Sequence, residues 1–447
     1  MKAVVLGGGV AGLTAGIALT RAGADTTIVE SAPYPGGLAW GFRDRGYTFD
    51  LFSHRLWTRD SDVLSLVREC VGEPLVSRRK VSRILLDGRL YNYPIDLRDL
   101  LVGGSALFAL RAAAGYASAR FGKSPGGDDF RAYLVSRYGA PLFDVFFGPY
   151  TEKLCGCPPQ DLSTDLAVGA VPDAGVLRQL VQRLIRRADP WDDFLYPARG
   201  FMEIPDGMAR LFQTSGGRLL LGHRVERLLR RGGAIRSVEV RSGDGRLDLP
   251  ADLVVSTIPL KGLLQALEPS AGPEPLASAA ALRNRAMIGV YLGIARDRLT
   301  EDHWVYVPDP SIRFNRLSET TNYSPAMAPP GKTGLCLEVA CDVGDGVWRE
   351  DDEAQVRRAV NDLVKIGWIG SASEVEASWV RRAPSAYPVY KVGYDRHFAV
   401  IEASLRSIRN LHLCGRQGSF WYGSTAQGIR QALDLVAGIG LAASQVA

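Results

Sequence analysis

The chain has 447 residues, of which 46% are hydrophobic and 23% are charged. At roughly 150 residues per domain this length predicts about three domains, and the composition excludes an intrinsically disordered chain. The 53 lysines and arginines exceed the 48 aspartates and glutamates by only 5, so the charge gives no reason to expect a nucleic-acid partner. Six cysteines are too few for a disulfide scaffold, and the start MKAVVLGGG is typical of a strand rather than a signal peptide. We expect a reduced, soluble, cytoplasmic protein.

The first thirty residues predict one β-α-β unit. Residues 2–6 form a short apolar run typical of a buried strand, and a glycine loop follows at residues 7–9. Residues 11–22 predict a helix closed by Gly23, and residues 25–30 predict a second strand that ends on an acid. Such a unit belongs to a parallel sheet, so we expect an α/β fold.

The middle of the chain predicts helices. Between about residues 91 and 189 the pattern is helical, with an amphipathic repeat over residues 177–187. The longest apolar stretch, residues 100–119, is interrupted by Arg111, so we expect a buried or amphipathic helix and no integral membrane segment. The apolar, arginine-studded helices of residues 100–190 could form a homodimer face, a membrane-surface face or a lid over a pocket.

The rest of the chain alternates strands with a final helix. Residues 218–257 predict a β-rich region with two glycine turns, and residues 281–307 and 333–341 predict further strands separated by a loop. Residues 409–415 predict one more short strand, and about residues 426–443 predict the last helix. Dinucleotide-type elements therefore lie at both ends and in the middle, which indicates interleaved domains.

The glycine loop carries a G-x-G-x-x-G pattern at Gly7, Gly9 and Gly12. Its glycines allow a tight turn, close approach of a pyrophosphate, and helix–strand packing. Glu30 lies 18 residues past Gly12 at the end of the next strand, where a carboxylate can bind ribose hydroxyls. The pattern alone is a weak signal and a glycine-rich turn with a surface glutamate is the alternative, but this context predicts dinucleotide binding. These residues leave the choice between FAD and NAD open.

Four blocks in order along the chain resemble the amine-oxidase-type FAD family, which includes protoporphyrinogen oxidases and UDP-galactopyranose mutases. They are Gly36-Gly37 after Glu30, the segment around Val225, residues 251–259 (ADLVVSTIP) and residues 410–418 (NLHLCGRQG). The resemblance implies an FAD cofactor and a Rossmann-type FAD-binding domain. It implies the following cofactor-binding residues: Gly7, Gly9, Val10, Ala11, Gly12, Glu30, Ser31, Gly36, Gly37, Leu38, His54, Arg55, Val225, Thr257, Gly415, Arg416, Gly423, Ser424 and Thr425.

The same resemblance implies a discontinuous domain arrangement. We expect residues 1–90, 195–275 and 395–447 to form the FAD-binding domain, residues 91–194 a helical subdomain or lid, and residues 276–394 a β-rich substrate-binding domain with a mixed sheet.

Further blocks resemble the galactopyranose-mutase-like branch of this family. They are residues 49–59, 149–156, 324–330 and 386–390, with Gly415-Arg416. The chain departs from the branch at Cys155, where members often carry Trp, and at residues 422–426, which lack an expected Asp. These departures concern the mutase activity rather than the flavin fold.

Several residues are candidates for the flavin or substrate pocket. His54 follows a strand that faces the flavin in the family, and it is our candidate base; a hydrogen-bonded structural histidine is the alternative. Trp421 and Tyr422 could form a stacking platform for a ring, with Tyr422 as a second catalytic candidate, or they could be core residues. Arg313 could bind an anionic group and Tyr150 could line the pocket, against a solvated and a structural role.

The last helix and the cysteines complete the set of candidates. Residues 423–425 form the entry of that helix, whose positive end could face the flavin, with Ser424 or Thr425 as the cap. Cys155 and Cys157 form a lone C-x-C pair without partners at metal-ligand spacing, so we expect no metal site.

Three functions follow from these residues and the resemblance. The first is an FAD-dependent oxidoreductase that takes a hydride from a CH–OH, CH–NH or CH–CH bond of a sugar-like or natural-product molecule. Oxygen or another acceptor then reoxidises the flavin. The alternatives are a redox-neutral mutase-like isomerase that uses reduced FAD on a nucleotide sugar, and a non-enzymatic binding protein similar to Rab GDP-dissociation inhibitors.

Overall fold

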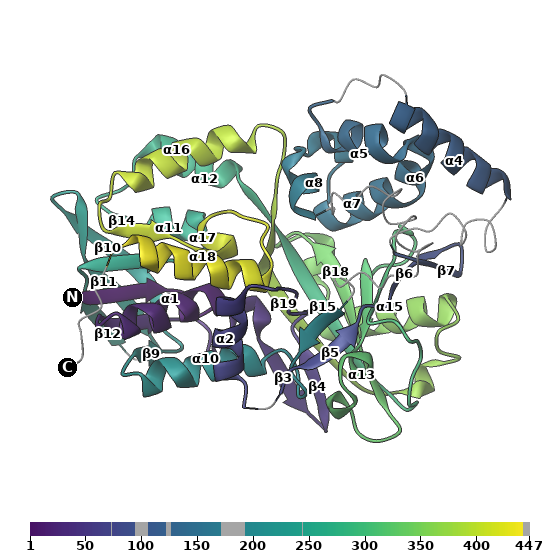
Figure 1. Ribbon diagram of the computed structural model, residues 1–447, viewed down its shortest axis with the longest axis horizontal. Coiled ribbons are helices and arrows are strands. Elements are labelled where there is room, and N and C mark those ends of the chain that lie inside the picture. Colours follow the sequence, from purple (N-terminus) through teal and green to yellow (C-terminus); the bar gives the residue numbers. More distant parts are fainter. Residues whose placement is uncertain (73, 94–105, 122–126, 171–192, 244, 441–447) are drawn as a thin grey trace.

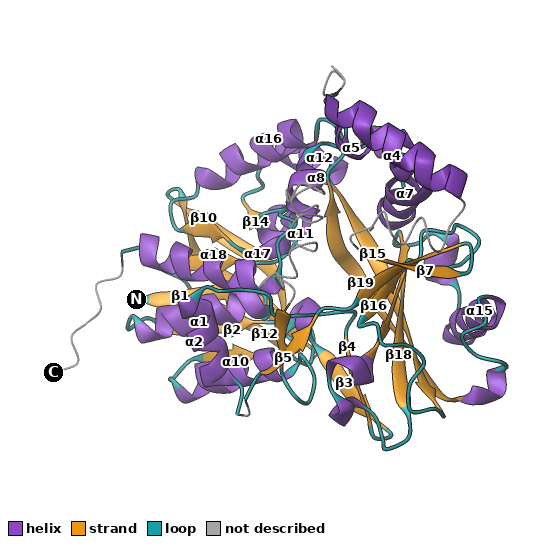
Figure 2. Cartoon of the chain, turned by 45° about the vertical axis from the view of Figure 1, so that its right-hand side comes forward, coloured by secondary structure: helices purple, strands orange, loops and turns teal. Residues whose placement is uncertain are grey.

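The computed structural model describes residues 1–72, 74–93, 106–121, 127–170, 193–243 and 245–440. They form the expected α/β fold, with a parallel sheet beside one end of the molecule and a large mixed sheet beside the other (Figures 1 and 2).

The parallel sheet contains the predicted β-α-β unit. In spatial order its strands are β20 (Leu411–Leu413), β13 (Leu253–Ser256), β1 (Lys2–Leu6), β2 (Asp25–Val29) and β9 (Arg218–Leu220). α1 (Val10–Arg21) packs against α18 (Thr425–Gly438) and α10 (Glu203–Thr214), as Figure 1 shows. The strands and helix predicted for the first thirty residues are confirmed to within one residue at each end, because a buried apolar run and a glycine turn are local signals.

A smaller sheet follows in the β-rich region predicted for residues 218–257. Its strands, in spatial order, are β12 (Gly245–Pro250), β11 (Ala234–Ser242), β10 (Arg224–Arg231) and β14 (Leu267–Glu268). Beside it, α11 (Leu260–Ala266) contacts α12 (Pro273–Ala281), and α12 contacts α16 (Tyr394–Arg406). Buried side chains of this sheet and of the parallel sheet share one hydrophobic core.

The large mixed sheet has seven strands. In spatial order they are β19 (Val375–Val389), β15 (Arg283–Ile294), β18 (Thr333–Cys341), β17 (Arg316–Glu319), β16 (Trp304–Tyr306), β6 (Ser82–Leu86) and β7 (Arg89–Asn92). α15 (Asp352–Lys365) packs on this sheet, and apolar side chains of the sheet and of α15 form a separate core.

Two strands of this sheet differ from the sequence prediction. β17 lies where a loop was expected, because its four residues are too short to show a periodicity of their own. β19 was not predicted as a strand, and it contains Pro384 and Pro388. It is the edge strand of the sheet, where a missing amide donor is tolerated, and its pairing with β15 shifts register beside Pro384.

The predicted helical region forms a group of helices above the mixed sheet (Figure 1). Its members are α4 (Ala106–Phe121), α5 (Phe130–Tyr138), α6 (Ala140–Leu142), a π-helical turn (Phe143–Phe147), α7 (Gly148–Cys155) and α8 (Asp165–Ala170). α4 confirms a helix in the apolar stretch, and none of the described helices is long and apolar enough to cross a bilayer. The amphipathic repeat at residues 177–187 lies outside the described residues.

The remaining elements are α2 (Ser61–Cys70) and two short antiparallel strand pairs. β3 (Gly41–Asp44) pairs with β4 (Tyr47–Asp50), and β5 (Val76–Arg79) pairs with β8 (Asp193–Tyr196). The division into three domains stays a prediction, with one correction at its first boundary. Residues 82–90 were assigned to the FAD-binding segment and residues 91 and 92 to the helical subdomain, but β6 and β7 belong to the seven-stranded sheet, because β6 pairs with β16.

Candidate functional site

The glycine loop between β1 and α1 forms a turn that leaves no room for a side chain at Gly7 or Gly12. Gly7 has a φ of +102°, and a Cβ on it would lie 2.3 Å from Thr257 Oγ1. A Cβ on Gly12 would lie 2.0 Å from the carbonyl oxygen of Gly7. Gly9 is the N-cap of α1, and within this described turn neither a side-chain cap nor an acidic residue covers the helix start at Val10. Free amides at such a helix end suit a diphosphate.

The second glycine pair lies directly against this loop. Gly36 donates its amide to the carbonyl of Gly8 at 2.8 Å, and it forms a parallel β-bridge with Gly9. Gly36 and Gly37 have φ values of +109° and +55°, a region that favours glycine. Leu38, the next residue, is half-buried. The two glycine motifs therefore form one continuous backbone surface, although 27 positions separate Gly9 from Gly36.

Glu30 is held in place by the backbone on both sides. Its two carboxylate oxygens accept the amides of Gly8 and Ala32, each at 2.7 Å, and the Ser31 hydroxyl donates to it at 3.2 Å. The carboxylate therefore lies beside the glycine loop, where a ribose next to a bound diphosphate would meet it. β10 begins close by, with Val225 half-buried two residues after His223, which donates its amide to the Glu30 carbonyl.

The C-terminal ends of three parallel strands meet beside the loop. β2 lies on one side of β1 and β13 lies on the other, so the strand order reverses at β1, which is where open α/β sheets bind ligands. Thr257 follows β13 and donates its hydroxyl to the Leu6 carbonyl at 2.8 Å. Gly415 follows β20 with a φ of +75°, and a Cβ on it would lie 3.0 Å from the Cβ of Ala11.

Arg416 closes the turn that leads to the last helix. Its guanidinium donates to the Gly423 carbonyl at 2.8 Å and to the Ala386 carbonyl at 3.1 Å. Ser424 then caps α18 in a reciprocal capping box with Gln427, and Thr425 is the first helical residue. Ser424 as a cap is therefore confirmed, while the contact of this helix end with flavin stays a prediction.

His54 lies near the two arginines of the site. Its Nδ1 is 3.3 Å from the Phe52 carbonyl, and its ring stacks on Phe201 with centroids 5.1 Å apart. Burial, then the charge of Arg416 and that of Arg316, lower the pKa of His54 to about 3. The imidazole is therefore neutral at physiological pH and a poor match for a general base.

The neighbouring residues extend this region toward the mixed sheet. The guanidinium of Arg55 lies 4.5 Å from the ring centroid of Trp304, a buried residue of β16. Phe52, two residues before His54, has a φ of +68°, which is a strained conformation for a phenylalanine. The chain therefore turns at Phe52, between the end of β4 and His54.

A group of tyrosines lies around Arg316. Tyr422 stacks on Tyr387 with centroids 5.2 Å apart, and the Arg416 guanidinium lies 5.0 Å from the Tyr387 ring. Tyr150 meets the ring of Tyr306 edge-on at 5.2 Å. Burial raises the pKa of both Tyr150 and Tyr422, and the charge of Arg316 opposes the rise in both cases. These phenols are therefore neutral hydrogen-bonding groups.

Arg316 itself is paired with an acid of the neighbouring strand. Its Nε and Nη2 donate to Glu338 at 2.8 and 2.6 Å, and the Glu338 side chain is 0% exposed. Glu338 also accepts the amide of Ser53 at 3.0 Å. The pair therefore connects the segment before His54 to the mixed sheet. The sequence did carry a signal for it, a single acid within the apolar run of β18, which needs a buried partner.

The structure places Arg313, the arginine singled out in the sequence as a binder of an anionic group, away from the group of tyrosines around Arg316. Arg313 pairs with Glu350 at 3.2 Å, and its amide donates to Asp362 of α15 at 2.6 Å. It lines a hollow of about 740 Å³ together with Lys153. Arg316 joins the tyrosines instead, because it lies in β17 opposite Glu338.

Trp421 contributes to the turn before α18 and not to the stack of tyrosines described above. Its amide donates to the Arg416 carbonyl at 2.9 Å, and its ring lies against Gly423, where a Cβ would be 2.6 Å from the indole. Trp421 is half-buried, and these contacts with the turn account for its position. The alternative of a stacking platform applies to Tyr422 with Tyr387.

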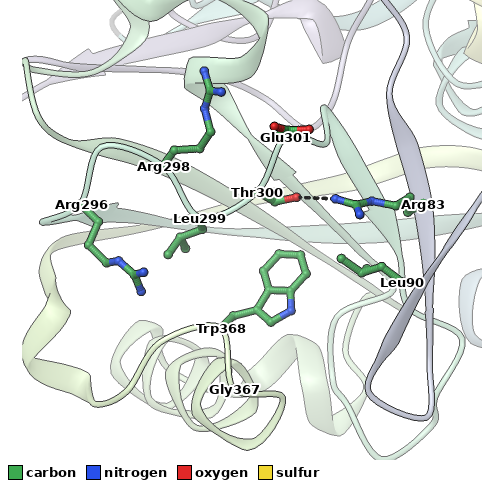
Figure 3. A pocket seen from close by; sticks show the side chains of 9 residues that line it. All are labelled: Arg83, Leu90, Arg296, Arg298, Leu299, Thr300, Glu301, Gly367 and Trp368. Carbon is green, nitrogen blue, oxygen red and sulfur yellow. Dashed lines mark hydrogen bonds between the residues drawn. The ribbon is translucent and has the colours of Figure 1, made fainter. Parts of the chain in front are cut away.

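A second hollow, of about 600 Å³, lies on the mixed sheet (Figure 3). Three arginines line it, with Trp368 between Leu90 and Leu299. Two of these arginines are already paired, Arg83 with Asp302 and Arg296 with Glu374. Among the described residues no group of three or more His, Cys, Asp or Glu side chains could hold a metal ion, and Cys155 and Cys157 are buried free thiols.

Comparison with known proteins decides the family. The profile of the flavin containing amine oxidoreductases matches residues 10–436, nearly the whole chain. The chain belongs to this family. Its members bind FAD, and the described residues of this amine oxidoreductase fit that cofactor, since the glycine surface, the anchored Glu30 and the open start of α1 adjoin one another. The protein is therefore a flavin-containing member of an oxidoreductase family, which favours the enzyme hypotheses over a non-enzymatic binding role.

Two named relatives of this flavin-containing amine oxidoreductase are both phytoene enzymes at low identity. A lycopene-forming phytoene desaturase of a Paracoccus species is 27% identical over 287 residues, which are 57% of this chain and 54% of that enzyme. A phytoene dehydrogenase of Streptomyces griseus is 25% identical over 403 residues, 78% of this chain and 75% of that enzyme. The chain thus spans about half the length of the Paracoccus relative that it matches.

Solved structures share the fold at low identity. A reduced UDP-galactopyranose mutase superposes with a TM-score of 0.85 at 20% identity, covering 98% of this chain and 95% of that one. Cyclohexylamine oxidase from Brevibacterium oxydans superposes with a TM-score of 0.69 at 17% identity, covering 98% of each chain. The predicted Rossmann-type flavoprotein fold is confirmed, and the roles of individual residues toward FAD and substrate stay predictions.

Proposed function

We propose that the protein oxidises a neutral or anionic, hydroxylated small molecule, such as a sugar-like or natural-product alcohol, by removing a hydride from a CH–OH group. The observation that carries this proposal is the charge around the tyrosines. The charges of Arg316 and Arg416 both lower the pKa of His54 and that of the Tyr422 phenol. Arginine and phenol donors suit oxygen atoms of a substrate.

Each residue of the site would have a definite task. FAD, when bound, would accept the hydride, and the hydroxyl proton would leave to water, because His54 is a poor base. Nδ1 of His54 lies toward the Phe52 carbonyl, so the neutral ring can leave Nε2 as an acceptor for the substrate hydroxyl. Tyr150 and Tyr422 would orient the substrate by donating hydrogen bonds, and stacked Tyr387 and Tyr422 would cover an apolar face of it.

The arginines argue against the substrates of several relatives. A cationic amine would meet the positive charge of Arg416, whose guanidinium donates to the Ala386 and Gly423 carbonyls rather than to an acid and which lowers the pKa of His54. A hydrocarbon polyene would leave the phenol donors without partners. A nucleotide diphosphate needs unpaired cations, whereas Arg316 is bound to Glu338 and Arg313 to Glu350. We therefore place the mutase-like isomerase second.

The test is reduction of the bound flavin without oxygen. Purified holoenzyme is mixed with one compound at a time from four sets: polyols and sugar alcohols, primary amines such as putrescine, a polyene such as phytoene, and UDP-galactose. Loss of the oxidised flavin band with a hydroxylated compound is the expected result. Rapid bleaching by an amine would overturn the proposal. Conversion of UDP-galactose to an isomer only after dithionite treatment would establish the second candidate instead.

The remaining expectations belong to this proposal. Oxygen or another acceptor reoxidises the flavin. A cytoplasmic location is supported by the six cysteines, all of which are buried free thiols.

A further inference from the structure

A buried carboxyl group lies behind His54 and has no part in the function proposed above. Asp50 ends β4 and is 6% exposed. One of its oxygens accepts the hydroxyl of Tyr196, and the other accepts the amide of Phe201 at 2.7 Å. A buried carboxyl group needs such partners. Tyr196 is the last residue of β8, and Phe201 lies five residues further along the chain.

These partners lead back to His54. The ring of Phe201, whose amide Asp50 accepts, is the ring on which the imidazole stacks. Asp50 and His54 are also only four residues apart in the chain, with the strained Phe52 between them. The carboxyl group therefore holds both the segment that carries His54 and the aromatic ring that supports it.

We propose that Asp50 is a positioning residue for His54. Asp50 acts through Tyr196 and Phe201, and the imidazole of His54 moves when the carboxyl group of Asp50 gains or loses a proton. The proposal rests on the placement of His54 in the flavin pocket. In this proposal the protonation state of Asp50, which lies behind His54, adjusts the position of the imidazole in that pocket.

The surroundings of Asp50 bring the protonation and deprotonation of its carboxyl group close to neutral pH. Burial raises the pKa of Asp50 to about 7, and the hydrogen bonds from Tyr196 and Phe201 oppose that rise. The other titratable or charged groups that interact with it are Arg43 of β3, Tyr291 of β15 and Cys336 of β18. Burial raises the pKa of Tyr291 and Cys336 well above their ordinary values, so Asp50 is the member of this set that titrates around pH 7.

The experiment follows the His54 ring by NMR in holoenzyme labelled with ¹³C-histidine. The chain has five histidines, so the His54 signal is assigned by its loss in His54→Gln. With a pKa of about 3, His54 does not titrate between pH 5.5 and 8.5, and a step in its signal over that range reports a neighbour. We expect a step centred near pH 7.

Three variants assign the step. Asp50→Asn should abolish it. The hydrogen bond from Tyr196 lowers the pKa of Asp50 in the wild-type protein. Tyr196→Phe removes this bond, so the step should move to higher pH. Asp44→Asn is the matched control on the same hairpin, where the carboxylate accepts the indole of Trp379 at 2.7 Å, and it should leave the step in place. An absent wild-type step, or a step that persists in Asp50→Asn, would overturn the inference. If Asp50→Asn does not fold, a Tyr196→Phe step at the wild-type pH overturns it.

Removal of FAD separates this inference from the proposed function. A His54 signal that does not change when FAD is removed would contradict the placement of His54 at the flavin. A signal that changes with FAD but lacks the Asp50-dependent step would contradict the positioning role alone.

Discussion

Arg316 and Glu338 face each other across β17 and β18 and form a two-bond ion pair, with the carboxylate side chain at 0% exposure. Because Glu338 also accepts the amide of Ser53, the pair joins the mixed sheet to the segment that leads to His54. One carboxylate thus connects β17 of the mixed sheet to the segment that carries His54.

Replacing Arg316 by alanine should destabilise the fold strongly, since it leaves a buried carboxylate without a cation. We expect the free energy of unfolding to fall by about 3–5 kcal/mol. Arg382→Ala is the control, because its partner Asp352 is 61% exposed and such a pair contributes about 1 kcal/mol or less. Chemical denaturation of both variants measures the difference, and equal losses would contradict the buried pair.

Gly12→Ala should prevent FAD binding. The new methyl group would lie 2.0 Å from the Gly7 carbonyl, so the loop must open. Gly262→Ala in α11 is the matched control, because nothing lies within 4 Å of its Cβ position. This control should keep FAD and gain about 0.5–1 kcal/mol of stability. Flavin absorbance per chain is the measurement, and a yellow Gly12→Ala protein would contradict the role of the glycine loop in FAD binding.

Glu30→Gln should weaken FAD binding. The amide group replaces one acceptor oxygen, so it cannot accept both the Gly8 and the Ala32 amides while it binds a ribose. A lost charge-assisted hydrogen bond corresponds to about a 10- to 100-fold rise in Kd. Asp25→Asn, an exposed residue of the same strand, should leave Kd unchanged in the same titration of apoprotein.

Lys153→Met should loosen α7, which carries Tyr150. The ammonium group donates to the carbonyls of Val307, Asp309 and Phe314 at 2.7–2.9 Å, and methionine leaves all three without this donor. We expect amide exchange in α7 to rise about tenfold or more, from about 1–3 kcal/mol of lost stabilisation. Lys365→Met removes an exposed lysine that binds Ser311 of the same loop. It should have little effect.

Stability should depend on pH through Asp50. Its pKa in the folded protein is about 7, above the ordinary value of 3.8, so the folded state keeps a proton that the unfolded chain has released between those pH values. The free energy of unfolding therefore falls as pH rises from about 4 to about 7. Asp50→Asn removes this contribution, so its stability relative to wild type should rise over that range in denaturation curves. A parallel pH dependence of the two proteins would rule out the raised pKa.

The sequence alone determined the cofactor end of the protein. The turn at Gly7, Gly9 and Gly12, the acid at Glu30 and the flanking strand and helix are all within thirty residues, and each depends on local backbone requirements. The edge strand β19 was beyond such reasoning, because its prolines are tolerated only where no neighbour needs their amides.

Only the tertiary structure decided the substrate end. Tyr150, Arg316 and Tyr422 come from segments more than 100 residues apart, and local patterns carry no information on which of their side chains meet. Arg313 and Arg316 are equivalent as residue types, yet strand pairing directs Arg316 to Glu338 and leaves Arg313 to Glu350. The buried Asp50 likewise acquires its partners from β8 and the residues after it, which lie some 150 positions further along the chain. Burial and long-range pairing, rather than residue type, set the charge and the hydrogen-bonding state of these groups.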